Sequence, residues 1–263
     1  MTVPTPQGTL YLVPAPLDFG CATQAPLQDV LPQGTLAVAA CLQHWIAENA
    51  KSTRAYLKRV YAAHPSAHTL QSLHIQELPR AVHKKGDHPG VAHDFDARPL
   101  LAAALGLDGA PQDIGLVSEA GMPAIADPGA SVVRAAHALG LRVVPLVGPS
   151  SLLLSLSVSG LNGQSFAFVG YLPQDASARN ARIRELEALA LHTGQSQLLI
   201  ETPYRNAAVL AALLAVLQPR TRLSVSFGMT LACMASRSAS VADWRAQPAA
   251  LPLDLPAVYC IGL

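Results

Sequence analysis

The stretch from residue 113 to residue 151 constrains the fold of this chain more than any other. Its first part, Asp113-Ile114-Gly115-Leu116-Val117, is a short apolar run that is typical of a buried strand. The run leads directly into the loop Ser118-Glu119-Ala120-Gly121-Met122-Pro123, where Gly121 lets a ligand approach the backbone closely. We therefore expect this loop to be a binding surface.

The second half of the same stretch predicts a helix and another strand. Asp127-Pro128-Gly129 indicates a helix start, because a carboxylate can cap unpaired amides and proline suits the first helical position. Gly140 is expected to stop this helix, and the apolar run from Leu141 to Val147 is closed by Gly148-Pro149-Ser150-Ser151. Two apolar runs joined by a crossover helix predict a right-handed βαβ unit.

Composition limits the class of protein. With 263 residues and 51% hydrophobic content, the chain can bury a full core, and its length suits one large domain or two ordinary ones, of which we favour two. We expect an N-terminal domain over residues 1–147 and a C-terminal domain over residues 148–263. A net charge of +1 with 13% charged residues excludes the global basic field that a sequence-independent nucleic-acid binder uses, although it leaves room for a local basic patch.

Cysteine and hydropathy patterns predict the compartment. The four cysteines lie far apart and form no C-x-x-C pair, which argues against zinc, iron–sulfur clusters and a disulfide framework and favours a reducing cytoplasm. No basic N-terminal segment precedes an apolar stretch, and prolines and a glycine interrupt the most apolar region, Val143 to Val158. The sequence therefore predicts a soluble cytoplasmic protein without a membrane segment.

A histidine-rich segment raises the question of a metal site. The segment from His64 to His93 holds six of the nine histidines and has little hydrophobic periodicity, so we expect a long surface excursion. His64 and His68 have the i, i+4 spacing of helical metal ligands. No carboxylate cluster accompanies them, and we expect no bound metal.

Hydrophobic periodicity and punctuating residues predict the remaining elements. The expected strands are 8–13, 35–40, 166–173, 197–201, 223–229 and 257–263. The expected helices are 45–60, 151–161, 182–192 and 206–217. The first of these helices carries Lys51, Arg54 and Lys58 on a basic side, and Gly194 is placed to end the third as a left-handed cap.

Six stretches, taken in chain order, match the motifs of one known family. They are Gly8 to Val13 with Pro16, Ala47 to Arg54 (A-E-D-T-R-x-T-R in the family), Leu116 to Gly129 (L-V-S-D-A-G-T-P-x-I-S-D-P-G), Val144 to Leu161 (V-P-x-P-G-P-S), Gly170 to Pro173 (G-F-L-P) and Glu201 to Arg205 (E-A-P-H-R). On these residues the chain resembles the tetrapyrrole methylase superfamily of S-adenosylmethionine (SAM) dependent methyltransferases. The closest branch looks like ribosomal RNA small subunit methyltransferase I.

The resemblance implies a fold and a function. It implies an α/β protein of two α/β domains, an N-terminal parallel sheet with helices and a C-terminal mixed sheet, with a SAM cleft between them. It also implies a SAM-dependent methyltransferase that 2′-O-methylates a ribose in ribosomal RNA of the small subunit, and a homodimer.

The resemblance assigns roles to particular residues. The implied cofactor-binding residues are Pro16, Ala120, Gly121, Met122, Ile125, Ser150, Ser151, Glu201 and Thr202. Loops at the carboxyl ends of parallel strands are also where open α/β sheets bind ligands. For Ser150 and Ser151, helix capping is an equal alternative, and for Glu201 the alternative is an ion pair with an arginine.

The candidate catalytic residues are Glu48, Lys51, Arg54 and Tyr171. The first three recur at three-residue spacing, so they are expected to share one helical face that holds a phosphate or activates a hydroxyl. A solvated charged face is the alternative. For Tyr171, at a strand end, the alternatives are a substrate contact and packing alone.

Several positions depart from the family pattern. Glu119 and Asn49 replace aspartates, Lys51 replaces an arginine, Tyr204 replaces a histidine, and no lysine follows Pro173. Asn49 matters most, because an amide cannot serve as a general base. Two alternatives therefore stay open: SAM-dependent methylation of a tetrapyrrole or other small molecule, and a catalytically silent member that binds SAM or RNA.

Overall fold

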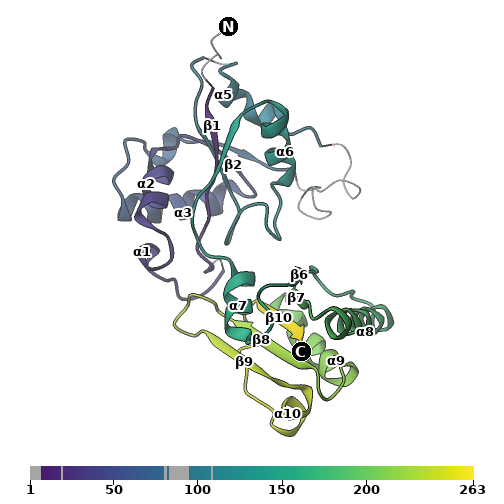
Figure 1. Cartoon of the computed structure of the whole chain (residues 1–263). Helices are drawn as coiled ribbons and strands as arrows, with labels where there is room; N and C mark the ends of the chain where they lie inside the picture. The colour runs from purple at the N-terminus through teal and green to yellow at the C-terminus, as the bar shows by residue number, and fades with distance from the viewer. Residues whose placement is uncertain (1–6, 19, 80–81, 83–94, 108) are drawn as a thin grey trace. The chain divides into compact units, whose positions relative to one another are not determined.

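The computed structural model describes residues 7–18, 20–79, 82, 95–107 and 109–263. The chain divides into two compact units (Figure 1). Unit 1 comprises Met1–Phe19 and Ala25–Pro149, and unit 2 comprises Gly20–Gln24 and Ser150–Leu263. Each unit is built around one five-stranded sheet.

The sheet of unit 1 is entirely parallel, with the order β3-β2-β4-β1-β5. Its strands are β1 (Thr9–Leu12), β2 (His44–Ala47), β3 (His74–Glu77), β4 (Ile114–Val117) and β5 (Arg142–Pro145). The central strands β2 and β4 are almost wholly buried, as expected for a parallel sheet that is covered on both faces, whereas β1 buries Leu10 and leaves its other residues partly exposed. The predicted parallel N-terminal sheet is therefore confirmed.

Helices cover both faces of this sheet (Figure 1). On one face lie α1 (Leu27–Val30), α2 (Gln33–Cys41) and α3 (Ala50–Ala63), with the short helix η1 (Leu70–Ser72). On the other face lie η2 (Arg98–Leu101), α5 (Ala102–Leu105) and α6 (Ala130–Ala138). Each face has its own apolar cluster, centred on Trp45 and Leu57 on the first and on Ile46 and Leu116 on the second.

The predicted strand 35–40 is wrong, because these residues lie inside α2. Leu36, Ala39 and Ala40 are buried at i, i+3 and i+4, which is the spacing of a helix face rather than of a strand. The second strand is instead His44–Ala47, and most of it overlaps the start of the predicted helix 45–60. The helix itself, α3, begins only at Ala50.

The crossover between β4 and β5 is present, but the two strands do not pair, because β1 lies between them and is parallel to both. Gly129, at φ 133°, occupies the N-cap position of α6, two residues after Asp127. The predicted position of Pro128 as the first helical residue is therefore wrong, because α6 begins at Ala130. Gly140, at φ 72°, follows the last turn of α6 in a left-handed conformation, which confirms that the helix stops there.

The histidine-rich segment begins with structure that the sequence did not predict. His74 to Glu77 form β3, an edge strand paired with β2. His64 ends α3 in an extended conformation, so it does not share a helical face with His68. Among the described residues, no group of three His, Cys, Asp or Glu side chains could hold a metal ion. Residues 80–81 and 83–94 of the predicted excursion lie outside the described part of the chain.

The sheet of unit 2 is mixed, as predicted, with the order β6-β7-β10-β8-β9 and only β6 and β7 parallel. Its strands are β6 (Phe166–Phe168), β7 (Ser196–Glu201), β8 (Arg222–Phe227), β9 (Ala235–Ser240) and β10 (Ala257–Gly262). Its helices are α7 (Ser151–Ser159), α8 (Ala176–Thr193), α9 (Pro203–Val216) and α10 (Val241–Ala246).

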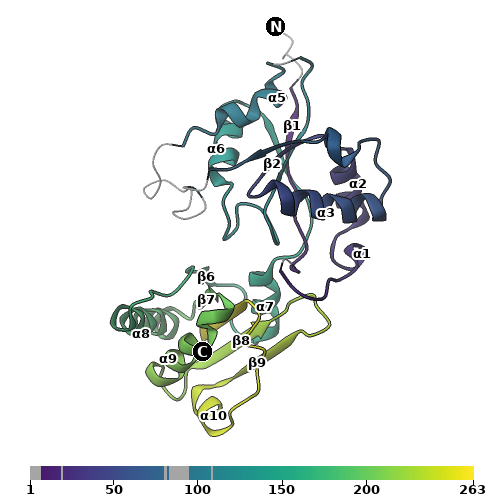
Figure 2. The same cartoon turned by 180° about the vertical axis from the view of Figure 1, so that it is seen from behind.

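The helices of unit 2 lie on both sides of its sheet (Figure 2). Residues of α8, α9 and α10 share one apolar cluster with the sheet, whereas Leu152 and Leu156 of α7 pack against Leu198 and Val258 in another. Gly194 ends α8 at φ 71°, which confirms the predicted left-handed cap. The sequence reading missed β9, whose residues are Ala-Ser-Arg-Ser-Ala-Ser and carry no apolar alternation.

Candidate functional site

The carboxyl edge of the unit 1 sheet gathers most of the residues that the sequence singles out. In parallel strands all carboxyl ends meet at one edge. Pro14 to Pro16 follow β1, Glu48 follows β2, and Ser118 to Met122 follow β4. Because β2, β4 and β1 are neighbours in the sheet, these three segments lie next to one another.

Backbone hydrogen bonds join the first loop to the glycine loop. The amide of Ala15 donates to the carbonyl of Gly121 at 2.9 Å, and the amide of Gly121 donates to the carbonyl of Ala15 at 3.0 Å. Gly121 adopts φ 69°, a conformation that residues with a Cβ rarely adopt. A Cβ there would also meet Leu17 Cδ2 at 3.2 Å. Gly121 therefore shapes the loop through its conformation, and Ala120 and Met122 on either side stay partly exposed.

Side chains from the helices hold these loops in place. The hydroxyl of Tyr56 on α3 donates to the carbonyl of Pro14 at 3.0 Å. Arg59, one turn further along, forms a two-pronged pair with the buried Asp18 at 2.9 and 2.8 Å. Gly148 after β5 packs directly against the ring of Pro14, where no Cβ would fit. The carboxyl edge is thus a fixed surface.

The segment after Gly121 contains unusual backbone geometry. Ala124 and Ala126 both have φ 64°, and between them Ile125 exposes 50% of its surface. Non-glycine residues in this region cost about 1–2 kcal/mol each, and they persist only where the surroundings fix them. Such strained segments cluster at ligand sites, so the geometry is consistent with the predicted contact through Ile125.

A group of carboxylates occupies this edge. Burial raises the pKa of Asp127 to about 7, and the negative charges of Glu48 and Glu119 add to the shift. Glu119 Oε1 accepts a hydrogen bond at 3.0 Å from the hydroxyl of Ser52 on α3. The hydroxyl of the buried Ser118 has no hydrogen-bond partner among the described residues. The site therefore offers hydrogen-bonding groups and negative charge to a cation.

Asp127 is the functional candidate that the sequence reading missed. Its Asp-Pro-Gly context is typical of a helix start, so the sequence predicts a helix cap at this position. Asp127 nevertheless belongs to the same motif as Glu119. Only the fold shows that its carboxyl group lies near those of Glu48 and Glu119. A carboxyl group that titrates near neutral pH suits proton transfer.

The predicted face of Glu48, Lys51 and Arg54 is only partly present. Glu48 precedes α3, so the three residues do not share a helical face as predicted. Lys51 and Arg54 do, and both are exposed. Neither side chain has a hydrogen bond or an ion pair with the described residues. They therefore make a small basic face beside the carboxyl edge, on the first two turns of α3.

Asn49 has a structural role at the start of α3. Its side-chain oxygen accepts hydrogen bonds from the amides of Lys51 and Ser52 at 2.9 and 3.1 Å. Glu77 Oε1 accepts from the amide of Ala50 at 2.6 Å. The helix N-terminus is thus fully capped, and asparagine serves here as well as the aspartate of the family motif.

Asn49→Ala should lower the free energy of unfolding by about 1 kcal/mol, whereas Asn49→Asp should change it by only a few tenths, because aspartate caps equally well. Denaturant unfolding of both variants measures this, with Lys51→Ala as the control for an exposed position on the same turn. An alanine variant as stable as the wild type would show that the cap contributes nothing.

In unit 2, the predicted residues meet at the carboxyl ends of β6 and β7. Glu201 is buried, and its Oε1 accepts from the amide of Thr202 at 2.8 Å. Its Oε2 lies 3.2 Å from Arg205 Nη2. Arg205 also donates to the carbonyl of Leu172 at 2.9 Å. The ion-pair alternative for Glu201 is therefore present, and it ties the loop after β6 to the loop after β7.

The other predicted residues of unit 2 are more accessible. Ser150 occupies the N-cap position of α7, yet its side chain does not cap the helix, so the capping alternative is wrong for this residue. Ser151 is the first helical residue. Thr202 is partly exposed, and Tyr171 exposes 55% of its surface. Contacts of these residues with a cofactor or substrate stay predictions.

Similar proteins agree with the resemblance found in the sequence. Over 102 residues the chain is 43% identical to "Ribosomal RNA small subunit methyltransferase I" of Xylella fastidiosa, which covers 39% of this chain and 36% of that protein. Over 135 residues it is 36% identical to the protein of the same name from Mesorhizobium japonicum, covering 51% and 44%. The chain thus aligns with less than half the length of these curated relatives. No family model matches the chain.

Solved structures match nearly the whole chain. A uroporphyrin-III C-methyltransferase from Thermus thermophilus covers 97% of this chain and 94% of its own, with a TM-score of 0.52 and 18% identity. A structure of uroporphyrin-III C-methyltransferase from Thermus thermophilus complexed with S-adenosyl homocysteine covers 97% of both chains, with a TM-score of 0.53 and 16% identity. The chain has the tetrapyrrole methylase fold. The predicted resemblance and fold class are confirmed, including the two α/β parts. No helix among the described residues is long and apolar enough to cross a membrane.

Proposed function

We propose that this tetrapyrrole-methylase-fold protein is a SAM-dependent methyltransferase that 2′-O-methylates a ribose in ribosomal RNA of the small subunit. The observation that carries the proposal is the carboxyl edge of unit 1, where the glycine loop is bonded to the first loop beside Glu48, Glu119 and Asp127. Relatives named ribosomal RNA small subunit methyltransferase I support the RNA acceptor.

The residues at this edge fit SAM. The donor carries a sulfonium and an ammonium group against one carboxylate, so a cluster of carboxylates attracts it. The partly exposed residues Ala120 and Met122 and the unpartnered Ser118 hydroxyl offer further hydrogen bonds. We propose that these residues, with Pro16, Gly121 and Ile125, hold the donor in unit 1. The predicted contacts from Ser150, Ser151, Glu201 and Thr202 belong to the same proposal.

Methyl transfer from SAM requires little of the protein beyond aligning donor and acceptor and accepting a proton. SAM supplies an electrophilic methyl group, so the acceptor oxygen bonds to the methyl carbon while the carbon–sulfur bond breaks toward sulfur. The protein must orient the hydroxyl and accept its proton. We propose Asp127, whose pKa is raised to about 7, and Glu48 for that second task. The amide at position 49 therefore does not exclude catalysis.

Lys51 and Arg54 are proposed to contact phosphates of the RNA. Lys51→Ala and Arg54→Ala should each weaken RNA binding and lower its salt dependence by about one unit of slope, because each removes one phosphate contact. SAM affinity should stay unchanged. Methyl transfer to small-subunit particles from a strain that lacks the enzyme, followed across a salt series, measures the effect.

Arg184→Ala is the matched control, because Arg184 is an exposed helical arginine of unit 2 with no predicted role. Equal activity and equal salt slopes for wild type, Lys51→Ala and Arg54→Ala would remove α3 from the RNA interface.

A small-molecule acceptor is the second candidate, because the fold matches uroporphyrin methyltransferases over almost the whole chain. A tetrapyrrole carries carboxylates rather than a phosphate backbone. Under that alternative, methyl transfer shows no steep salt dependence. A labelled methyl group supplied on SAM is then recovered in small molecules rather than in RNA. A silent binder, the third alternative, would bind SAM without turnover.

We also propose that the protein acts in the cytoplasm as a homodimer. The abundance of apolar residues and the resemblance support self-association. Light scattering should give twice the mass of the chain at micromolar concentration. A monomer at every concentration tested would overturn this part of the proposal.

A further inference from the structure

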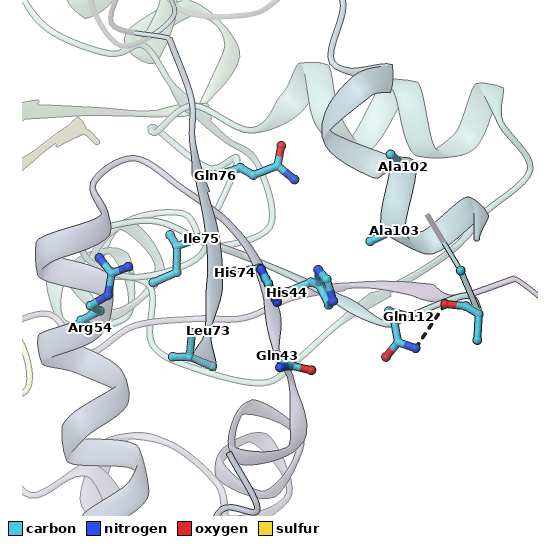
Figure 3. A pocket seen from close by; sticks show the side chains of 12 residues that line it. Gln43, His44, Arg54, Leu73, His74, Ile75, Gln76, Ala102, Ala103 and Gln112 are labelled. Carbon is cyan, nitrogen blue, oxygen red and sulfur yellow. Dashed lines mark hydrogen bonds between the residues drawn. The ribbon is translucent and has the colours of Figure 1, made fainter. Parts of the chain in front are cut away.

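A second feature of unit 1 lies at the opposite, amino edge of its sheet. A cavity of about 700 Å³ is lined there by the residues that start β2 and β3, by α5 and by the turn before β4. Figure 3 shows its labelled side chains on both sides of the edge strand β3, with His44 and His74 on one side and Arg54 on the other. The candidate substrate residue Arg54 therefore lines this cavity too.

Two stacked imidazoles form part of the cavity wall. His44 and His74 are register partners in the parallel pair β2 and β3, so their side chains point to the same face. Their ring centroids lie 4.8 Å apart, with an interplanar angle of 15°. His74 is exposed. Burial, and then the charge of His74, lower the pKa of His44, which favours the neutral form of that ring. The stacked pair offers a flat aromatic surface.

The remaining lining combines small residues with amides. Ala102, Ala103 and Gly109 leave space opposite the imidazoles. Gln43 donates through Nε2 to the carbonyl of Ser72 at 3.0 Å, which fixes its amide and leaves the oxygen as an acceptor. Gln76 and Gln112 add two more amides. Among the described residues that line the cavity, none is an aspartate or a glutamate, so this part of the lining carries no negative charge.

We propose that this cavity binds a nucleobase of a single-stranded segment of the RNA substrate, stacked on the imidazole pair, with its edge hydrogen-bonded by the glutamine amides. This inference rests on the proposed RNA acceptor. Single-stranded RNA is recognised by such stacking platforms with hydrogen bonds to base edges. The volume falls within the range of small-ligand sites. Arg54 lies across β3 from the imidazoles, and in this proposal it contacts a phosphate of the same strand.

The test is fluorescence anisotropy of the full chain with a labelled single-stranded oligoribonucleotide at fixed salt. His74→Ala should weaken binding by at least about fivefold, the lower end of what one stacked base contributes. His74→Phe should restore binding, because phenylalanine keeps the aromatic face. His137→Ala, an exposed histidine on α6, is the control and should bind like the wild type.

The outcomes separate this inference from the proposed reaction. Wild-type affinity in His74→Ala would overturn the nucleobase site, even if methyl transfer occurs. Equally tight, His74-dependent binding of a free mononucleotide would also overturn it, because the cavity would then serve a small nucleotide rather than a strand. If RNA binding depends on His74 while the wild type transfers no methyl group, the site stands and the proposed reaction fails.

Discussion

Arg205→Leu should lower the free energy of unfolding by about 3–5 kcal/mol, because it leaves the buried carboxylate of Glu201 without its cation. The Glu201 side chain has no exposed surface, and Arg205 Nη2 lies 3.2 Å from its Oε2. The same guanidinium also donates to the carbonyl of Leu172, so the variant leaves that group unpaired as well. Denaturant unfolding of the full chain measures the loss.

Two further variants show whether the cause is the uncompensated charge. The double variant Glu201→Gln with Arg205→Leu should be more stable than Arg205→Leu alone, because a neutral amide needs no cation. Arg182→Ala breaks a surface pair with Glu185 at 2.7 Å and should cost no more than about 0.5 kcal/mol. A double variant no more stable than the single one would place the effect in packing rather than in charge.

Asp127→Asn should raise stability and weaken SAM binding, two effects of opposite direction. The pKa of Asp127 is raised from 3.8 to about 7 in the folded protein. The stability that this group contributes is therefore fully present below pH 3.8 and is lost as the pH rises through about 7. At pH 8 the asparagine variant avoids that loss, so its free energy of unfolding should exceed the wild-type value by up to about 4 kcal/mol.

The same carboxylate should favour a bound cation once it is ionised. Wild-type affinity for SAM should rise as the pH increases through about 7, with proton release on binding, because a nearby positive charge lowers the pKa of the carboxyl group. In Asp127→Asn, affinity at pH 8 should fall by about tenfold and lose this pH dependence. Calorimetry in buffers of different ionisation enthalpy measures both, with the exposed Asp29→Asn as the control. A less stable Asp127→Asn variant, or unchanged pH-dependent affinity, would contradict this role.

The sequence predicted the fold class because its strongest signals were local. The apolar runs around Leu10, Leu116 and Leu199 are strands in the structure, and Gly194 ends α8 as its left-handed conformation requires. The alanine-rich run 35–40 was wrongly predicted to be a strand, because short apolar runs fit a strand and a buried helix equally well. In the structure, the i, i+3 and i+4 spacing of the buried residues in this run identifies it as part of α2.

The site was less predictable, because its parts meet only through the fold. Glu48 and Asp127 are far apart in sequence, and neither their proximity nor the strained alanines beside Ile125 can be read from local pattern. His44 and His74 stack because β2 and β3 pair in one particular register. The register of a strand pair depends on the whole sheet, so no sequence motif predicts that these two histidines stack.

The proposed function is tested most directly by supplying SAM with a labelled methyl group to the purified protein and extracts of a strain that lacks it. RNA, protein and small-molecule fractions are then separated and counted. We predict that the label enters small-subunit RNA at a ribose 2′-oxygen, and that this transfer depends on the added protein. Label found only in small molecules, or no transfer by a protein that binds SAM, would contradict the proposed function.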